Sequence, residues 1–575
     1  MTWRIRNDAC FKGQSCSQPV NTLDIHYNGR LEDEPTGHDG PAKAGHYVRI
    51  AAAALLGGVV YLNALHNPFV YDDHHTVVQN PSIASVTDVR AVVLGAVTRP
   101  IVNFSYALDR AVWGAGPFGF HVTNVLLHML NVVLLFQLAW RFEKGRLLVA
   151  FAAAMLLAVH PMMTEAVGYI SGRSEVLCAT FFMLAILSGR RWMVGRVLSD
   201  PAHRRVPKDP PYAPSSRTWA CVTVALWIAA LATKETAAMF PFVFLAYDWL
   251  AVQGSAPARR RRLLTVHLPM IATAVVAGIV RLFILARIEY PGQVSVHWSY
   301  LLLELDVVRR YLWMMINPSG QAIFHEVTTV GLLDPRTWLA IVVVAGLLAL
   351  SWNVRRSNWP ASIGMLWFFL ALVPSSVLAV LDQGEPMAEH RVYMASCGLF
   401  LAVGAWIGRL AEWGANPAEA GSHVRAGHYV RAGHTNITSV RRVVGAGLAL
   451  VVLAFAAQTL LRNAVWADPV ALWQEAVDLA PGHDRPRLLL GEALQDAGRR
   501  NEALEQYRTA IRLRPSDPIG YVKVGQVLAE IGQWPQARQL FLEAIAIDAA
   551  NVPAQNALAV LDALETRLGV DGNRR

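Results

Sequence analysis

Residues 119–140 read GFHVTNVLLHMLNVVLLFQLAW, an apolar stretch without a charged side chain. A straight transmembrane helix needs roughly 20 predominantly apolar residues, so this stretch has the length of a membrane span. His121, Asn124, His128 and Asn131 follow one another at spacings of three, four and three, which places them on one face of the helix. Because polar groups are costly in lipid, that face must contact protein or water, and the stretch predicts one helix of a larger bundle.

The rest of the chain repeats this apolar pattern. Of the 575 residues, 54% are hydrophobic and 16% are charged, and the apolar residues fall in long blocks. Together these blocks predict an all-α, polytopic membrane protein with eleven spans. The other ten blocks lie near residues 50–65, 147–163, 175–192, 218–232, 236–252, 263–286, 337–352, 361–380, 394–410 and 443–461.

Basic loops predict the orientation of the spans. Lys and Arg prefer the cytoplasmic side, and eleven spans satisfy every basic loop at once. The N-terminus is then cytoplasmic, whereas the C-terminus lies outside. A further segment, 301–316, could be a twelfth span, but we predict an interfacial helix in which Asp306 can pair with Arg309 or Arg310. The basic loops are 141–146, 190–217, 258–262, 355–356 and 441–442.

Charge and cysteine content disfavour several other classes of protein. Lys and Arg exceed Asp and Glu by 51 to 42, but the excess sits in membrane-flanking loops, so nucleic-acid binding is not predicted. The five cysteines lack CxxC spacing, which indicates neither a disulfide framework nor a zinc site. The polar segment 1–48 is predicted to be disordered and cytoplasmic. Its AGHYVR sequence recurs within 423–434, in a low-complexity cytoplasmic loop, 411–441.

A period of 34 residues follows the last span, within residues 462–575. The aromatic and small residues recur in register, which is typical of tetratricopeptide repeats (TPR). Two repeats with flanking half-repeats would form a short solenoid after the membrane domain 49–461, and such solenoids typically hold an extended peptide. The repeating positions are Trp473, Tyr507 and Phe541; Ala476, Ala510 and Ala544; and Gly491 and Gly525.

The sequence FVYDDHH (69–75) opens the first predicted external loop, 66–118, and the same membrane face should gather other charged residues. Such a mixture suits a reaction in which carboxylates handle a hydroxyl nucleophile while cations hold a phosphate leaving group. The alternative is a set of ion pairs that anchor helix ends. The predicted members include Asp72 and Asp73; His160, Glu165 and Arg173 of the segment 160–175; Lys234 and Glu235; and Glu389, His390, Arg391 and Tyr393.

Several motifs in order resemble the transmembrane and TPR-containing O-mannosyltransferase family, in particular its bacterial members. The resemblance covers roughly residues 50–565. It implies the GT-C glycosyltransferase fold, in which a sugar moves from a polyprenyl-phosphate carrier to an acceptor on the non-cytoplasmic side. The motifs are FVYDDHHTVVQN, RPIVNFSYALDRAVWGAGPFGFHVTNVLLH, AVHPMMTEAVGYISGRSEVL, ATKETAAMFPFVFLAYD and MAEHRVYMAS.

The resemblance also implies roles for individual residues. Asp72 and Asp73 match the acidic pair of the first external loop, where one carboxylate acts as base or positions the acceptor. With Glu165 they form the predicted catalytic set. The expected donor-phosphate ligands are Arg173, Lys234, Arg391 and Arg281; the other expected pocket residues are His121, Asn124, His160, Glu389 and Tyr393, with His390 interrupting the ER-type motif at Glu389.

The donor and the partners complete this expectation. The donor is a polyprenyl-phosphate-linked sugar already in the bilayer, and no resident cofactor is predicted. The YDDHH cluster offers ligands for a divalent ion, but its spacing is not diagnostic. The TPR units could hold an acceptor polypeptide through residues such as Asn501 and Lys523. The alternatives are a polymerase or ligase of lipid-linked glycans, an inactive TPR scaffold and a transporter; the sugar, the acceptor and the oligomeric state do not follow from the sequence.

Overall fold

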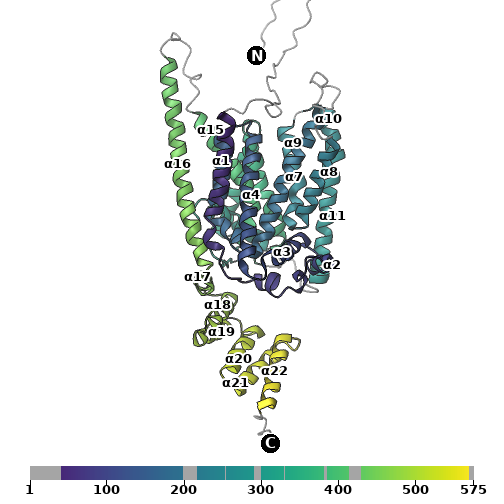
Figure 1. Ribbon diagram of the computed structural model, residues 1–575, viewed down its shortest axis with the longest axis vertical. Coiled ribbons are helices and arrows are strands. Elements are labelled where there is room, and N and C mark those ends of the chain that lie inside the picture. The colour runs from purple at the N-terminus through teal and green to yellow at the C-terminus, as the bar shows by residue number, and fades with distance from the viewer. Residues whose placement is uncertain are drawn as a thin grey trace, which may run out of the picture. The chain divides into compact units, whose positions relative to one another are not determined.

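The computed structural model describes residues 41–198, 216–252, 254–289, 299–328, 330–380, 385–413 and 429–568. Within these ranges every regular element is helical, which confirms the predicted all-α fold (Figure 1). Residues 1–40 of the predicted disordered segment 1–48 and residues 414–428 of the predicted loop 411–441 lie outside the described residues. The described remainder of both segments is helical, which corrects the prediction, because the helices Pro41–Val59, Val392–Trp413 and Tyr429–Val465 extend into them.

Eleven helices of the membrane region coincide with the eleven predicted blocks. Eight of them, α1, α4, α7, α11, α13, α14, α15 and α16, are long and apolar enough to cross a membrane, so the chain is a membrane protein. The bounds are α1 Pro41–Val59, α4 Pro117–Phe142, α5 Leu147–Val159, α7 Arg173–Leu198, α8 Ser216–Leu231, α9 Phe240–Ala251, α11 Leu268–Ile284, α13 Pro335–Val354, α14 Trp359–Val380, α15 Val392–Trp413 and α16 Tyr429–Val465.

The three remaining helices of this set are shorter. α5 ends at His160, and the chain turns by 58° into a short helical stretch, Pro161–Val167, that includes α6 (Thr164–Val167). α8 has 16 residues, and α9 has 12 and follows a 3-10 turn, η7 (Glu235–Met239). Because these helices fall short of roughly 20 residues, the count of eleven crossings stays a prediction.

Close helix packing in the bundle depends on small residues and on the polar face of α4. A Cβ atom at Gly398 would lie 2.7 Å from the carbonyl oxygen of Gly364, so α14 and α15 approach at backbone distance. On α4, His128 Nδ1 lies 2.8 Å from the Tyr393 hydroxyl, and Asn131 donates to the same hydroxyl at 3.2 Å. The polar face of residues 119–140 therefore contacts protein, as the sequence predicts.

Of the remaining helices of the membrane region, α10 continues into α11 within one candidate span, Ala256–Ile288, and α2, α3 and α12 lie outside the candidate spans. α12 carries Asp306, which pairs with both Arg309 at 2.8 Å and Arg310 at 2.9 Å. Between α1 and α4, η2 (His74–Val78) is followed by α2 and α3, near the end of the bundle from which α17 leads away (Figure 1). The bounds are α2 Val89–Gly95, α3 Pro100–Trp113, α10 Ala256–Arg262 and α12 Ser299–Met314.

Six helices after α16 form the TPR solenoid. Two of them begin with the same local signal, because Asp468 and Asp517 cap the first turns of α17 and α20 and a proline follows each. A Cβ atom at Gly525 would lie 2.5 Å from the ring of Phe541, so the repeating glycine makes room for the repeating aromatic. The bounds are α17 Pro469–Leu479, α18 Asp484–Asp496, α19 Arg500–Leu513, α20 Pro518–Glu530, α21 Trp534–Ile547 and α22 Val552–Leu568.

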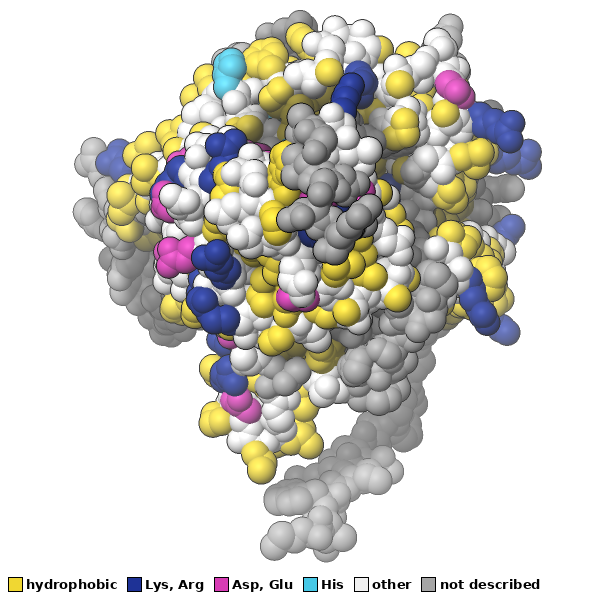
Figure 2. All heavy atoms as spheres, turned by 90° about the horizontal axis from the view of Figure 1, so that it is seen from below, with side chains coloured by type: hydrophobic (Ala, Val, Ile, Leu, Met, Phe, Trp, Pro, Cys, Tyr) yellow, Lys and Arg dark blue, Asp and Glu magenta, His cyan; other side chains and the backbone are white. Residues whose placement is uncertain are grey.

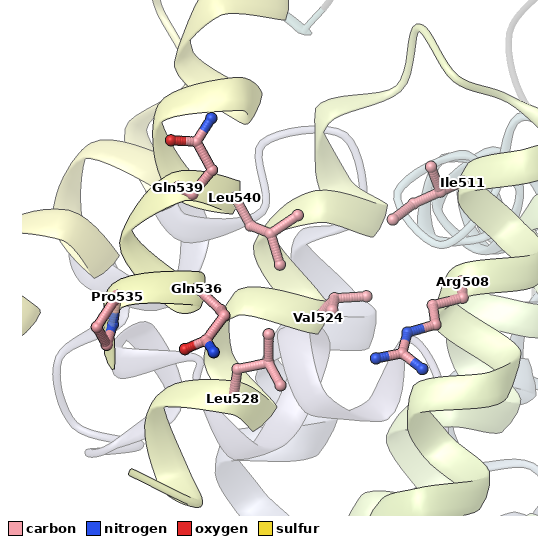
Figure 3. A pocket seen from close by; sticks show the side chains of 8 residues that line it. All are labelled: Arg508, Ile511, Val524, Leu528, Pro535, Gln536, Gln539 and Leu540. Carbon is pink, nitrogen blue, oxygen red and sulfur yellow. The ribbon is translucent and has the colours of Figure 1, made fainter. Parts of the chain in front are cut away.

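The surface of the solenoid carries paired charges and a groove. Arg499 pairs with Glu502, and Arg500 pairs with Glu530. On the face seen from below, acidic and basic side chains are interspersed among apolar ones (Figure 2). The groove has a volume of about 580 Å³ and is lined by Arg508, Ile511, Val524, Leu528, Pro535, Gln536, Gln539 and Leu540 from α19, α20 and α21 (Figure 3).

Candidate active site

The two adjacent carboxylates of the loop between α1 and α4 have different surroundings. Asp73 is fully buried, and one of its oxygens accepts hydrogen bonds from the Ser171 backbone N–H at 2.8 Å and the Ser171 hydroxyl at 2.6 Å. Its other oxygen accepts from the Val70 N–H at 3.2 Å. Asp73 therefore connects the loop between α1 and α4 to the segment between α6 and α7.

Asp72 instead carries an exposed carboxylate. Among the residues that the structure describes, none hydrogen-bonds to this carboxylate, whereas the backbone N–H of Asp72 donates to the Tyr169 hydroxyl at 3.0 Å. Thr76 binds the Asp72 carbonyl at 2.9 Å and lies 2.7 Å from the Ser171 hydroxyl. The backbone of Asp72 is thus fixed while its carboxylate stays open to a substrate.

The buried Asp73 gives the fold a pH dependence. Burial raises the pKa of the Asp73 carboxyl to about 7, although the bonds from Ser171 and Val70 lower it. Because this folded-state pKa lies above the unfolded value, the protonated carboxyl stabilises the folded state. This stabilisation is fully present below about pH 4 and is lost as the pH rises through 7. We expect the free energy of unfolding to fall by about 2 kcal/mol between pH 5.5 and 8.

Denaturant unfolding of the purified protein at several pH values measures this fall. The matched comparison is the Asp73→Asn variant, which keeps the size of the side chain and cannot titrate. A fall of the same size in the variant would show that another group is responsible.

A second carboxylate, Glu165 of α6, holds a histidine. Its oxygens lie 2.6 Å from His390 Nδ1 and accept a hydrogen bond from the His390 backbone N–H at 3.1 Å. Glu165 is buried, whereas the His390 side chain is 23% exposed, and no bond to His390 Nε2 occurs among the described residues. A histidine oriented in this way presents Nε2 outward for hydrogen bonding or proton transfer.

The Glu389 carboxylate has hydrogen-bond partners that differ from those of its neighbour His390. Its carboxylate accepts from the Ala322 N–H at 2.8 Å, from Gln321 at 2.8 Å and from His325 at 3.0 Å. It therefore anchors the chain after α12. The histidine that interrupts the ER-type motif of the sequence is thus the partner of Glu165, and Glu389 has a separate structural contact set.

Three cations lie within electrostatic reach of the His390 ring: Arg99, Lys234 and Arg391. Lys234 is buried and pairs with Glu175 at 2.7 Å. Arg99 is 40% exposed and lies 3.5 Å from Glu235, and Arg391 donates to the Glu385 carbonyl at 2.6 Å. We name Arg99, Lys234 and Arg391 the cation group.

Glu385 connects the cation group to the loop of Asp72. Its carboxylate accepts a hydrogen bond of 3.0 Å from the hydroxyl of Tyr71, the residue before Asp72. Its backbone carbonyl accepts from Arg391. Burial also raises the pKa of the Glu385 carboxyl above its ordinary value. The exposed carboxylate of Asp72 and the cation group therefore lie on connected segments.

Arg173 has a different position from the one expected of a phosphate ligand. Its side chain is fully buried and forms an ion pair with Asp109 at 2.5 Å. It also donates to the Asn124 side chain at 2.7 Å and to the Phe120 carbonyl at 2.7 Å, and it lies over the ring of Tyr106. These contacts occupy both edges of the guanidinium and favour a structural role that joins α3, α4 and α7.

The other expected pocket residues are also held by protein groups. His160 Nε2 lies 3.0 Å from the Met315 carbonyl, and His121 Nε2 lies 3.1 Å from the Asn67 carbonyl. Asn124 donates to backbone carbonyls between α6 and α7, including that of Tyr169 at 3.2 Å. Tyr393 belongs to the polar contacts of α4. Arg281 acts electrostatically on Glu235, near the cation group.

Four residues of this region were not singled out in the sequence: Arg99, Tyr169, Ser171 and Glu385. Arg99, Tyr169 and Ser171 lie inside quoted motifs, so their motif membership is a signal that could have found them, whereas Glu385 lies outside every quoted motif. Ser171 and Glu385 acquire their roles only through contacts with residues 98 and 314 positions away.

The described residues were compared with the ligand sets that hold divalent metal ions in proteins. No group of three or more His, Cys, Asp and Glu side chains that could hold a metal occurs there. His74 and His75, which follow the acidic pair, are both exposed. The described geometry therefore gives no support for assigning a metal to FVYDDHH.

Comparisons with known proteins agree with the motifs. The family model described as tetratricopeptide repeat matches residues 488–552, which confirms the predicted repeats. The human protein O-mannosyl-transferase TMTC1 is 24% identical over 534 residues, covering 81% of this chain and 55% of that protein. The Caenorhabditis elegans protein O-mannosyl-transferase F38B6.6 is 21% identical, covering 80% of this chain and 61% of that protein.

A solved structure shows a more distant likeness. It is the crystal structure of ArnT from Cupriavidus metallidurans bound to undecaprenyl phosphate, with 14% identity, a TM-score of 0.38 and coverage of 77% of this chain and 81% of that one. The chain spans little more than half the length of the curated relatives. The comparisons nevertheless confirm the resemblance drawn from the motifs: over about four fifths of its length, the chain is similar to protein O-mannosyl-transferases.

Proposed function

We propose that the chain is a GT-C-type glycosyltransferase that moves a sugar from a polyprenyl phosphate to a hydroxyl group of an acceptor. The observation that carries this proposal is the open carboxylate of Asp72, whose backbone is fixed beside a segment that leads to the cation group. A base for a hydroxyl and cations for a phosphate are the two requirements of this reaction. The similarity to protein O-mannosyl-transferases supports mannose as the sugar and a protein Ser or Thr hydroxyl as the acceptor.

The reaction follows from these two requirements. The acceptor oxygen forms a bond to the anomeric carbon of the sugar, and its proton passes to the Asp72 carboxylate. The bond between the anomeric carbon and the phosphate oxygen breaks, and the polyprenyl phosphate leaves with the electron pair. Direct attack from the face opposite the phosphate inverts the anomeric configuration. No step in this sequence needs a redox cofactor.

The cation group is our candidate for the phosphate site. Arg99 and Arg391 retain partial exposure, and Lys234 lies beside them with Glu175 as its buried partner. Charge-assisted hydrogen bonds from such groups stabilise the negative charge that gathers on the leaving phosphate. Glu165 orients His390 toward the same group. We assign Arg173 a structural role in place of the phosphate contact expected from the sequence.

Arg391→Ala should raise the KM for the polyprenyl-phosphate donor about tenfold, because a hydrogen bond to a charged group contributes about 1.5 kcal/mol or more. The measurement is the initial rate of sugar release as a function of donor concentration in lipid vesicles. Arg336→Ala is the matched control, because Arg336 forms an exposed pair with Asp334 at the start of α13. Equal KM values for both variants would remove Arg391 from the phosphate site.

The location of the acceptor belongs to the same proposal. We place the reaction on the non-cytoplasmic side of a bacterial inner membrane, with the N-terminus cytoplasmic and the solenoid outside. The groove between α19, α20 and α21 offers apolar contacts from Val524 and Leu528, beside the polar side chains of Arg508 and Gln539 (Figure 3). Such a mixed lining suits an extended acceptor polypeptide.

The deciding experiment uses the purified full-length chain in lipid vesicles with radiolabelled polyprenyl-phosphate mannose. We expect release of the sugar and its transfer to serine- or threonine-rich polypeptides. Polyprenyl-phosphate glucose and a lipid-linked oligosaccharide, supplied in parallel, test the alternative of a glycan polymerase or ligase. If none of these donors is consumed, the glycosyltransferase proposal fails and the scaffold alternative gains support.

A further inference from the structure

The start of the TPR solenoid contacts the loop that carries Asp72. Arg485, at the beginning of α18, hydrogen-bonds to the hydroxyl of Tyr71 and lies 3.7 Å from the Glu385 carboxylate. Its guanidinium also lies over the Tyr71 ring at 5.5 Å from the centroid. Trp473 of α17 contacts the Tyr71 ring edge to face, with 5.5 Å between the two ring centroids.

Tyr71 has an unusual backbone conformation that makes these contacts informative. Its φ angle is 52°, in the left-handed region that non-glycine residues rarely adopt. Such a conformation persists where surrounding contacts hold it in place. Because Tyr71 directly precedes Asp72, the contacts that hold its backbone also set the position of the Asp72 carboxylate.

Two further contacts join the same parts of the chain. Tyr169, whose hydroxyl accepts from the Asp72 N–H, stacks on Trp466 just after α16 at 5.5 Å between ring centroids. His483, just before α18, contacts the ring of Phe324 at 5.4 Å. The apolar core of the solenoid accordingly includes Val70 and Tyr169 of the membrane region. The loop of Asp72 is therefore held from the solenoid side as well as by Asp73.

We propose that Arg485 is a positioning residue: with Trp473 and Glu385 it forms a latch on Tyr71 that keeps the Asp72 loop in its working conformation. The first TPR unit is then part of the support of the reaction centre, in addition to any role in holding an acceptor. The effect on turnover rests on the function proposed above, whereas the effect on the order of the loop does not. Arg485 itself contacts neither donor nor acceptor in this assignment.

The first test is hydrogen exchange of the backbone amides of residues 70–76, measured by mass spectrometry on the full-length protein in lipid nanodiscs. We expect Arg485→Ala to exchange about tenfold faster there than the native chain. The Arg485 side chain is 53% exposed, so its removal leaves the fold of the solenoid intact. Arg487→Ala is the matched control, because Arg487 lies on the same helix and contacts Gln506 instead of the loop.

The second test is turnover of the polyprenyl-phosphate donor by the same variants. A displaced base slows the chemical step, so we expect Arg485→Ala to lower kcat about tenfold while KM for the donor stays within about twofold. Arg485→Lys should recover at least about half of the native kcat, because a lysine can still pair with Glu385. Tyr71→Phe removes the shared hydroxyl, and adding Arg485→Ala to it should slow the reaction less than the two single effects multiplied.

The outcomes separate the latch from the proposed function. Faster exchange in Arg485→Ala than in Arg487→Ala supports the latch, even if the native chain consumes no donor; in that case the glycosyltransferase proposal alone fails. Equal exchange in the two variants overturns the latch. A raised donor KM with unchanged kcat in Arg485→Ala would also overturn the positioning role, because it would indicate a contact with the donor.

Discussion

Asp72→Asn should lower the rate of sugar release from the polyprenyl-phosphate donor by roughly 10² to 10⁴-fold, the usual contribution of a general base. The amide is nearly isosteric with the carboxylate and cannot accept the proton of the acceptor hydroxyl. Since the Asp72 side chain is exposed and has no partner among the described residues, its replacement leaves the packing of the loop unchanged. The KM for the donor and the midpoint of thermal unfolding should therefore remain close to the native values.

The neighbouring Asp73→Asn variant is the sharpest control for this result. The single amide oxygen of this variant can still accept from Ser171. Its NH₂ group would face the Val70 N–H, which then lacks an acceptor. We expect a loss of about 1 to 3 kcal/mol in the free energy of unfolding, with a smaller effect on turnover than in Asp72→Asn. If Asp73→Asn abolishes turnover and Asp72→Asn does not, the buried carboxylate is the base and our assignment is wrong.

These two residues show which part of the site the sequence could predict. The pair stands out because two carboxylates and two histidines follow an apolar segment directly. This signal lies within one short stretch of sequence, FVYDDHH. The difference between Asp72 and Asp73 is set by Ser171, which lies 98 residues from Asp73. Neighbouring residues in a tight turn point in different directions, and the sequence alone does not show which direction leads to solvent.

More of the fold than of the site could be predicted, because the sequence patterns that indicate the fold are periodic. The spacing of polar residues on α4 gave the face that contacts protein, and the 34-residue period gave the solenoid, in which Gly525 makes room for Phe541. Contacts such as Glu165 with His390, 225 residues apart, have no comparable period. The same limit applies to the latch, because Arg485 of the solenoid contacts Tyr71 of the membrane region.

Arg173 and Arg391 illustrate the limit most clearly. Both arginines lie in quoted motifs, and both were expected to bind phosphate. The structure surrounds Arg173 with protein acceptors and leaves Arg391 partly exposed. Burial depends on the helices that pack around each residue, and that information lies far away in the sequence. The two arginines should consequently respond differently to substitution.

Arg173→Ala should destabilise the whole protein, by about 3 to 5 kcal/mol in the free energy of unfolding, because it leaves the buried Asp109 carboxylate without its cation. Asn124 and the Phe120 carbonyl lose their donor as well. The measurement is the midpoint of thermal unfolding of the full-length protein in lipid nanodiscs, with Arg391→Ala as the matched control that should unfold at the native temperature.

The double variant Arg173→Met with Asp109→Asn separates charge from packing. It removes both members of the ion pair, so no unpaired charge remains buried, and it should be more stable than Arg173→Ala despite carrying two substitutions. If the double variant is folded, its donor KM becomes measurable and should match the native value, since neither residue contacts the phosphate in our assignment. A folded Arg173→Ala protein with native stability and a raised donor KM would instead restore Arg173 to the phosphate site, because only a ligand contact changes KM without changing stability.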